Sequence, residues 1–190
     1  MEPIETEYKG YRFRSRLEAR WAVFLDALNV QYQYEPEGFR FEDGTRYLPD
    51  FWIEKSELWL EVKGSAPTAD EKSKAEKLHE IGTPVVVGVS EPHFGRLMVY
   101  AYDAKESSGG CQWWDSAEEL EGVALLPAPG LGMGIAPYFQ SRTFPAPGIQ
   151  CLTPREYEDG EYTGVEAVKK AALDARSAQF EHGEKGAGRV

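Results

Sequence analysis

Two neighbouring segments, Tyr47-Leu-Pro-Asp-Phe-Trp-Ile53 and Leu58-Trp-Leu-Glu-Val-Lys-Gly64, decide the fold of this chain. Side chains of a strand alternate between its two faces, so Glu61 and Lys63 project from one face and the aliphatic residues between them from the other. Charged side chains at the end of a buried strand are costly unless something uses them. With Asp50 on the preceding segment, the group contains two carboxylates and an ammonium. This set suits a magnesium ion and a phosphodiester.

The segments on either side of this pair predict an α/β sheet flanked by helices. Apolar periodicity, capping residues and turn signals support each element. The expected elements are a strand over 8–14, a helix over 16–28 with Ser15 as its N-cap, a strand over 32–41 interrupted at 36–38, a hairpin turn at Asp43-Gly44, strands over 46–53 and 58–63, a helix from Thr68 to Gly82, a buried parallel strand over 84–89, and a strand over 96–102.

After residue 105 the pattern becomes irregular. Residues 127–148 are rich in proline and glycine and indicate irregular chain. Residues 165–180 predict an alanine-rich helix, and the last residues are expected to fray. The chain is therefore divided into a core over 1–105 and a C-terminal extension over 106–190 that ends in a helix. The role of this extension is left open.

Composition and charge limit the class of protein. A chain of 190 residues with 42% hydrophobic residues fits one globular domain with an appended subdomain. Its apolar runs are far shorter than the roughly 20 residues that span a bilayer, and no secretory signal is visible, so a cytoplasmic protein without membrane contact is expected. The net charge of −11 argues against tight non-specific DNA binding, although a local basic stripe at 11–16 can act within an acidic whole.

The two cysteines predict no disulfide framework. Cys111 and Cys151 lie far apart and belong to no CxxC pair, so they are interpreted as free thiols in a reducing compartment. Zinc binding with His79, His93 or His182 is an open alternative that no ligand spacing supports.

The constellation around Glu61 has the residue types that phosphodiester hydrolysis requires. A water must lose a proton near neutral pH, and the charge of the phosphorane must be neutralised; Mg²⁺ (or Mn²⁺) does both while held by one or two carboxylates. Asp50 and Glu61 are the expected ligands, with the backbone carbonyl of Val62 as a third. Lys63 is expected to orient the attacking water or hold a phosphate oxygen, with a pKa lowered by burial and by the metal.

Glu18 is a further candidate, because it borders the buried face of the first helix and can reach the same metal or a second ion. Each residue also has an ordinary structural explanation. Glu18 matches the third position of a capping box, and both of its roles can coexist. Asp50 after a proline can be a turn residue, and Glu61 with Lys63 can form a surface ion pair.

The order of these motifs, with Leu48-Pro-Asp50 before Leu60-Glu-Val-Lys-Gly64 and a helical glutamate ahead of both, resembles the PD-(D/E)XK nuclease superfamily. The segment Phe13–Ala22 resembles the first helix of a phage-type branch near transposon-end endonucleases and Holliday junction resolvases. The resemblance covers about residues 8–102. It implies a restriction-endonuclease-like mixed sheet flanked by helices, metal ligation by Asp50 and Glu61, and catalytic roles for Lys63 and Glu18.

Contacts to DNA are expected from Arg12, Arg14 and Arg16, which stand just ahead of the helix that carries Glu18. The alternative is that some of them are only solvated surface residues. Trp113 and Trp114 can stack on unpaired bases, although aromatic residues more often pack in a core.

The resulting hypothesis is a phage-encoded, Mg²⁺- or Mn²⁺-dependent deoxyribonuclease that acts in the host cytoplasm as an endonuclease and leaves 5′-phosphate ends. A homodimer or a protein partner is also expected, since nucleases that cut two strands are often dimers. The main alternative is a catalytically silent module that keeps the nuclease fold and binds DNA or a host protein. A component that works only within a larger complex is a third alternative. The preferred DNA structure and sequence are left open.

Overall fold

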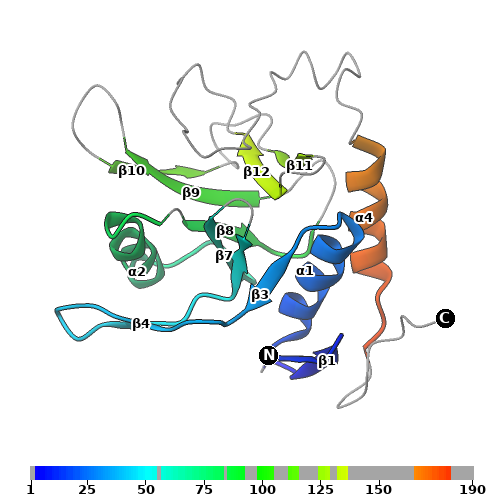
Figure 1. The fold of residues 1–190 in the computed structure, drawn as a ribbon, viewed down its shortest axis with the longest axis horizontal. Helices are drawn as coiled ribbons and strands as arrows, with labels where there is room; N and C mark the ends of the chain where they lie inside the picture. The colour runs from blue at the N-terminus through cyan, green and yellow to red at the C-terminus, as the bar shows by residue number, and fades with distance from the viewer. Residues whose placement is uncertain are drawn as a thin grey trace.

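The computed structural model describes residues 3–54, 57–83, 85–92, 98–104, 111–115, 124–128, 132–136 and 165–180. These residues form a mixed α/β fold (Figure 1). In chain order, the elements are β1 (Thr6–Tyr8), β2 (Tyr11–Phe13), α1 (Arg16–Ala27), β3 (Tyr32–Tyr34), β4 (Phe39–Arg40), β5 (Arg46–Tyr47), β6 (Phe51–Ile53), β7 (Leu58–Lys63), α2 (Ala69–Glu80), β8 (Val85–Val89), β9 (Met98–Ala104), β10 (Cys111–Asp115), β11 (Ala124–Ala128), β12 (Gly132–Ala136) and α4 (Val165–Ser177).

The largest sheet of the described residues has the strand order β10-β9-β8-β7-β6-β3. β7 and β8 run parallel and are connected through α2, whereas the other neighbours are antiparallel. The parallel register pairs Glu61 with Val87. All five residues of β8 are buried, which confirms the prediction of a strand covered on both faces.

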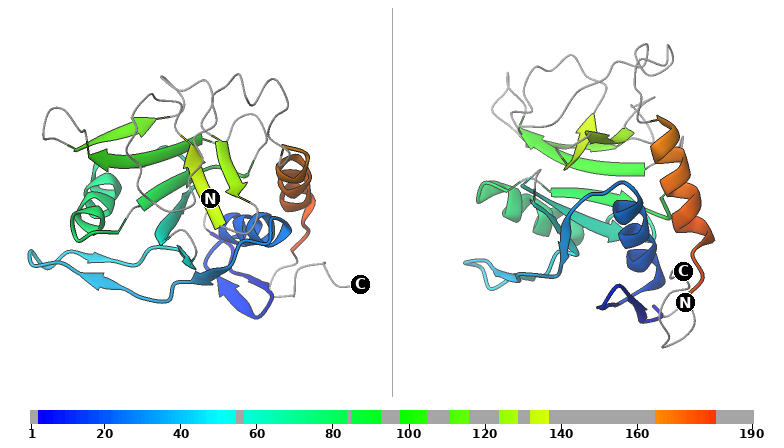
Figure 2. Two further views of the ribbon diagram at one scale, coloured as in Figure 1. Left: turned by 45° about the horizontal axis from the view of Figure 1, so that its top comes forward. Right: turned by 45° about the vertical axis from the view of Figure 1, so that its right-hand side comes forward.

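Helices cover both faces of this sheet, as the sequence predicts. Leu60 and Val86 pack in one core cluster with side chains of α1 and α4. Trp59 and Val85 pack in a second cluster with Leu78 of α2. Figures 1 and 2 show α1 and α4 side by side and α2 away from them. Alternate residues of β7 therefore face different helices, and Glu61 and Lys63 share the α2 face with Trp59.

The predicted caps of the first two helices are confirmed. The Ser15 hydroxyl accepts a hydrogen bond from the Glu18 backbone N–H at 3.2 Å. Thr68 and Glu71 form a complete capping box at the start of α2. Gly82 follows the end of this helix with a φ of 100°, a conformation that favours glycine.

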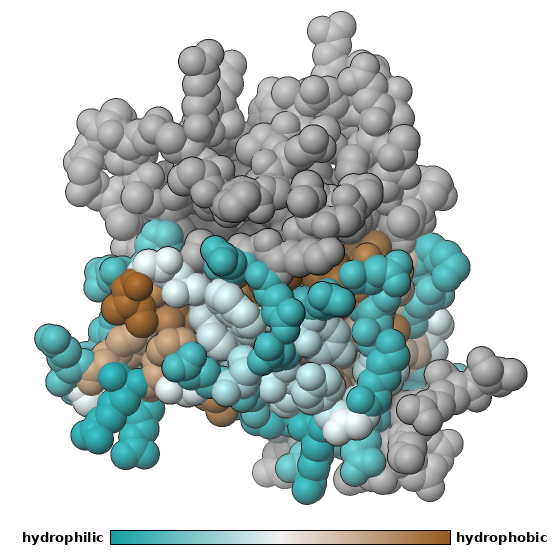
Figure 3. Space-filling view, viewed as in Figure 1, coloured by the Kyte–Doolittle hydropathy of each residue, from teal (hydrophilic) through white to brown (hydrophobic). Residues whose placement is uncertain are grey.

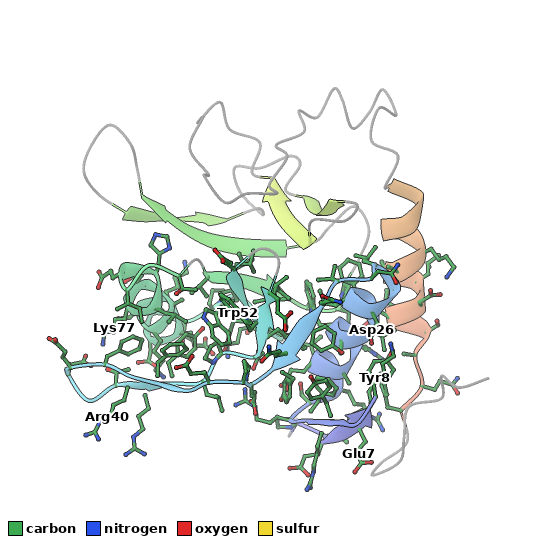
Figure 4. The ribbon with its side chains drawn as sticks, viewed as in Figure 1. Glu7, Tyr8, Asp26, Arg40, Trp52 and Lys77 are labelled. Atoms are coloured by element: carbon green, nitrogen blue, oxygen red, sulfur yellow. The ribbon has the colours of Figure 1, made fainter. Side chains whose placement is uncertain are left out.

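The predicted strand over 32–41 is divided into β3 and β4, which belong to different sheets. Glu35 has a φ of 45° and precedes a proline, so the chain leaves the large sheet there. β4 and β5 form an arm, with the predicted turn at Asp43-Gly44 between them. Lys77 of α2 binds this arm through the Thr45 hydroxyl, at 2.9 Å, and through the Asp43 carboxylate. Figure 4 labels Lys77 on the α2 side and Arg40 on the arm.

The prediction of irregular chain over 127–148 is wrong in its first part, where β11 and β12 form an antiparallel pair. Pro127 lies in β11, a strand of a two-stranded ribbon, where the missing N–H of a proline is tolerated at an edge. The helix predicted over 165–180 is confirmed as α4. Cys151, His93, His182 and the terminal residues expected to fray lie outside the described residues.

Within the described part of the chain, no helix combines the length and the apolar character needed to cross a lipid bilayer. Figure 3 shows hydrophilic side chains over most of the described surface on the face viewed in Figure 1.

Candidate active site

Asp50 lies directly before β6 and is almost completely buried, with 2% of its surface exposed. Its Oδ2 accepts a hydrogen bond from the Val62 backbone N–H at 2.7 Å. The ladder between β6 and β7 pairs residues only as far as Phe51 with Leu60. The Asp50 carboxylate therefore takes the place of a strand partner at the point where β7 runs beyond β6. Asp50 is therefore both a residue of the turn before β6 and a carboxylate placed beside β7.

Glu61 and Lys63 meet on one face of β7, as alternation predicts. Lys63 Nζ lies 2.6 Å from Glu61 Oε1, and Glu61 is 5% exposed. The Tyr47 hydroxyl donates to Glu61 Oε2 at 3.2 Å. Glu71, the capping residue of α2, lies 3.4 Å from the same ammonium. The pair is therefore built into the interior between the sheet and α2 and is not a surface ion pair.

The backbone carbonyl of Val62 points toward the Asp50 side of β7. In a strand, the N–H and C=O of one residue point to the same side, and the Val62 N–H donates to Asp50. The neighbouring Lys63 carbonyl points the other way and accepts from the Ser90 N–H at 2.8 Å. Oxygen atoms of Asp50 and Val62 thus face one edge, next to the Glu61 side chain.

Arg14 is held within this group by two carboxylates. Its Nη2 lies 2.6 Å from Asp50 Oδ1, and its Nε lies 2.5 Å from Glu35 Oε1. Half of the Arg14 side chain is exposed, whereas Asp50 is buried beneath it. The guanidinium therefore neutralises Asp50 from the solvent side. Its place beside Asp50 makes it part of the site and not a separate contact surface.

Glu18 lies beside the same group but is already bonded by neighbours. Its Oε1 accepts from the Ser15 hydroxyl at 2.7 Å, and its Oε2 accepts from the Tyr34 hydroxyl at 2.5 Å. The Arg14 backbone N–H also donates to Oε2 at 3.1 Å. The Ser15 cap is therefore present, but the Glu18 carboxylate accepts from the Ser15 hydroxyl and the Arg14 N–H in place of the Ser15 N–H that a capping box would use. These bonds fix the carboxylate in position at the start of α1.

The burial of Asp50 raises its pKa well above the usual range for an aspartate. The negative charges of Glu61 and Glu18 raise this pKa further, while the Val62 N–H and Lys63 lower it in part. For Lys63, burial lowers the pKa, but the carboxylates of Glu61, Asp50 and Glu71 outweigh it, so the net shift is upward. Burial acts on the Lys63 pKa in the expected direction, but the nearby carboxylates reverse the net shift, and the expected effect of a bound metal stays a prediction.

A divalent cation fits part of this arrangement. Asp50, Glu61 and the Val62 carbonyl supply hard oxygen atoms, the donor type that Mg²⁺ prefers, and Mg²⁺ commonly keeps several waters when bound to one or two carboxylates. In the described part of the chain, no group of three or more His, Cys, Asp or Glu side chains is arranged to hold a metal ion. Glu18 therefore does not complete a preformed cluster, and the fit rests on two carboxylates and a carbonyl.

The remaining predicted residues lie outside this group. Arg12 is exposed on β2 and pairs with Glu5. Arg16 stands at the start of α1, one residue beyond the Ser15 cap. Trp113, Trp114 and Cys111 lie in β10, whose side chains are outside the described part.

Sequence reasoning missed four members of the site: Tyr34, Tyr47, Glu35 and Glu71. Tyr47 opens the stretch that decides the fold, two residues before the Pro-Asp pair, so its position was a usable signal. Tyr34 and Glu35 come directly before the interruption predicted at 36–38, but the strand was predicted to continue after it, so the pattern did not indicate that they reach the site.

The sequence matches no protein-family model, and a search of curated proteins finds no relative.

Proposed function

We propose that this protein is a Mg²⁺- or Mn²⁺-dependent deoxyribonuclease with a restriction-endonuclease-like fold of the PD-(D/E)XK type. The observation that carries the proposal is the packing of two buried carboxylates, Asp50 and Glu61, against one end of β7 together with Lys63. Charged groups buried at this cost are expected to serve chemistry. The order of a hairpin, α1, the three large-sheet strands β3, β6 and β7, α2 and the parallel strand β8 supports the same assignment.

Each residue has a role in this proposal. Asp50, Glu61 and the Val62 carbonyl hold the cation, which when bound lowers the pKa of a water and neutralises charge on the phosphate. Lys63 orients the attacking water or holds a phosphate oxygen as a positive point charge. Glu18 holds its place at the start of α1 and adds negative charge beside Asp50. Arg14, which pairs with Asp50 in the metal-free protein, is placed to contact a phosphate.

The test uses supercoiled, linear and branched DNA with Mn²⁺ or Mg²⁺. Asp50→Asn, Glu61→Gln and Lys63→Ala are expected to lower the cleavage rate at least about 100-fold, because each removes a group that holds or orients the reactants. Asp70→Asn and Lys74→Ala are matched controls, since these residues form an exposed pair at 2.6 Å on α2. They should cleave as the wild type does. Cleavage that survives the three site substitutions would overturn the assignment.

The rival function is a catalytically silent module that binds DNA or a host protein. The absence of a preformed three-carboxylate cluster among the described residues favours it, as does the net charge of −11. Calorimetric titration with Mn²⁺ separates the two proposals. A nuclease should bind Mn²⁺ and lose that binding in Asp50→Asn, whereas a silent module should bind none and cleave no substrate while remaining folded.

A further inference from the structure

Two arginines, Arg20 of α1 and Arg176 of α4, share the Glu91 carboxylate, and a third, Arg16, lies one turn from Arg20 on α1. Arg20 of α1 pairs with Glu91 Oε1, and Arg176 Nε of α4 lies 4.0 Å from Glu91 Oε2. Arg16, one helical turn before Arg20, makes no ion pair with any described residue. The cluster of Arg16, Arg20 and Arg176, called the arginine patch below, therefore keeps an excess of two positive charges beside Glu91.

Two donor atoms of the arginine patch are buried without an acceptor. The Nε atoms of Arg16 and Arg20 are both inaccessible to water, and neither has a hydrogen-bond partner. Buried donors are nearly always paired in folded proteins, so an orphaned pair on adjacent turns of one helix indicates a missing acceptor. Burial lowers the pKa of Arg20, and the positive charges of Arg16 and Arg176 lower it further. These three guanidiniums are therefore close enough to favour an anion between them.

The arginine patch adjoins the candidate active site. The Trp21 indole N–H donates to the Ser90 carbonyl at 2.9 Å, and the Ser90 N–H donates to the Lys63 carbonyl at 2.8 Å. Glu91 follows Ser90 in the sequence. The carboxylate that pairs with Arg20 and Arg176 therefore lies just after the end of β8, next to the backbone of Lys63. On the other side, Arg16 follows the cap that fixes Glu18. α4 lies alongside α1 in each view, which extends this surface to Arg176 (Figures 1 and 2).

We propose that Arg16, Arg20 and Arg176 bind successive phosphates of a nucleic-acid strand and hold it against the candidate active site. The proposal rests on the proposed function for the claim that the bound nucleic acid leads to the candidate active site. It also assigns the C-terminal helix a part in substrate binding. Guanidinium groups suit phosphates because their planar donors match two oxygen atoms at once. A local patch of this kind supplies the attraction that the acidic chain as a whole does not.

The test measures binding, not cleavage. Fluorescently labelled single-stranded and duplex DNA are titrated with the full chain in EDTA, over a range of sodium chloride concentrations, and followed by anisotropy. Arg16→Gln, Arg20→Gln and Arg176→Gln should each weaken binding about tenfold, and each should lower the salt slope by about 1. Lys170→Gln is the matched control, because Lys170 is an exposed cation of α4 that already pairs with Asp174 at 2.9 Å. It should bind as the wild type does.

The outcomes separate the arginine patch from the proposed function. Arg16→Gln and Arg176→Gln carry the decisive comparison, since Arg16 has no ion-pair partner among the described residues and Arg176 is nearly half exposed. Wild-type affinity and salt slope in these two folded variants would overturn the patch, even if the protein cleaves DNA. Absence of DNA binding by the wild type would also overturn it. Binding that depends on the patch in a protein that cleaves nothing would uphold the patch and reject the nuclease.

Discussion

Asp50 holds a carboxylate where only 2% of the residue is exposed, with Glu61 and Glu18 nearby. Three acidic groups in one interior region are unfavourable unless cations neutralise them. Arg14 and Lys63 supply that neutralisation at 2.6 Å from Asp50 and Glu61. At the residue scale, the site is therefore a group of carboxylates whose negative charges are neutralised by basic side chains. In the proposed function, a bound divalent cation would take over part of this neutralisation.

The raised pKa of Asp50 predicts a pH dependence of stability. The folded protein binds the Asp50 proton more tightly than the unfolded chain does, so the free energy of unfolding should fall as pH rises from the usual aspartate value of about 4 through the raised value. Asp50→Asn should flatten this fall and be the more stable protein at neutral pH. Urea denaturation in EDTA at a series of pH values measures the free energy of unfolding of both proteins.

Asp43→Asn is the control for this measurement. Asp43 is an exposed residue whose pKa is lowered, chiefly by its hydrogen bond to Lys77. Its contribution to stability is complete above the usual aspartate pKa and is lost only below it, so the slope at higher pH should not change. An unchanged slope in Asp50→Asn would contradict the assignment of a raised pKa to Asp50.

At the scale of elements, the contact between α1 and β8 positions the site. α1 carries Glu18, and its Trp21 packs over Gly88 of β8. A Cβ added at Gly88 would lie 2.6 Å from Trp21 Cζ2 and 2.8 Å from Cη2, which is too close for any real contact. The glycine is therefore required by the approach of a helix to the sheet and not by an unusual backbone conformation.

Gly88→Ala should lower the free energy of unfolding by about 1–3 kcal/mol and reduce cleavage, because α1 must move away from β8 and takes Glu18 with it. Gly64→Ala is the matched control at the end of β7, where no atom lies within 4 Å of the added Cβ. Urea denaturation and the DNA cleavage assay measure both effects. Equal stability of the two variants would show that the Trp21 contact is not tight.

At the scale of the whole molecule, α4 joins the core formed by the first 90 residues. Ala171, Ala172 and Ala175 are buried in the same cluster as Trp21 and Leu25 of α1. Small side chains on α4 allow the two helices to approach closely. The structure of the first helix therefore depends on a segment more than 130 residues later in the chain.

Substitutions on the buried and exposed sides of α4 should differ strongly in their effect on the free energy of unfolding. Ala175→Glu places an unpaired charge where the residue is 0% exposed, and it should cost at least about 3 kcal/mol of unfolding free energy. Leu173→Glu changes a residue that is 65% exposed and should leave stability nearly unchanged. Thermal or urea unfolding followed by circular dichroism measures both variants. Similar losses in the two would mean that α4 does not pack through its alanine face.

Local signals predicted most elements of the sheet and helices, because capping residues, β-branched runs and the Asp43-Gly44 turn act through near neighbours in sequence. The break after Tyr34 lies next to the interruption predicted at 36–38, but the separation of β3 and β4 into different sheets was not predicted, because the alternating pattern resumes after the interruption. The pair β11 and β12 escaped because proline and glycine are poor strand formers except at an edge.

The candidate site was predictable in its charged residues and not in their partners. Alternation placed Glu61 and Lys63 on one face, and the structure confirms that they meet. The contacts of Tyr34 with Glu18 and of Arg14 with Asp50 join residues that are 16 and 36 positions apart. Such contacts follow from the packing of α1 on the sheet, which no single window of sequence contains.

The packing of α4 on α1 also determines when the candidate site can be completed during synthesis of the chain. Ribosomes add about 5–20 residues per second, so α1 emerges about 7–30 seconds before its partner helix is complete. Until then, the apolar side of α1 that α4 covers stays open, and the helix that carries Glu18 lacks one of its supports. A nascent chain would therefore carry every acidic residue of the candidate site well before the helix that holds Glu18 has its full packing.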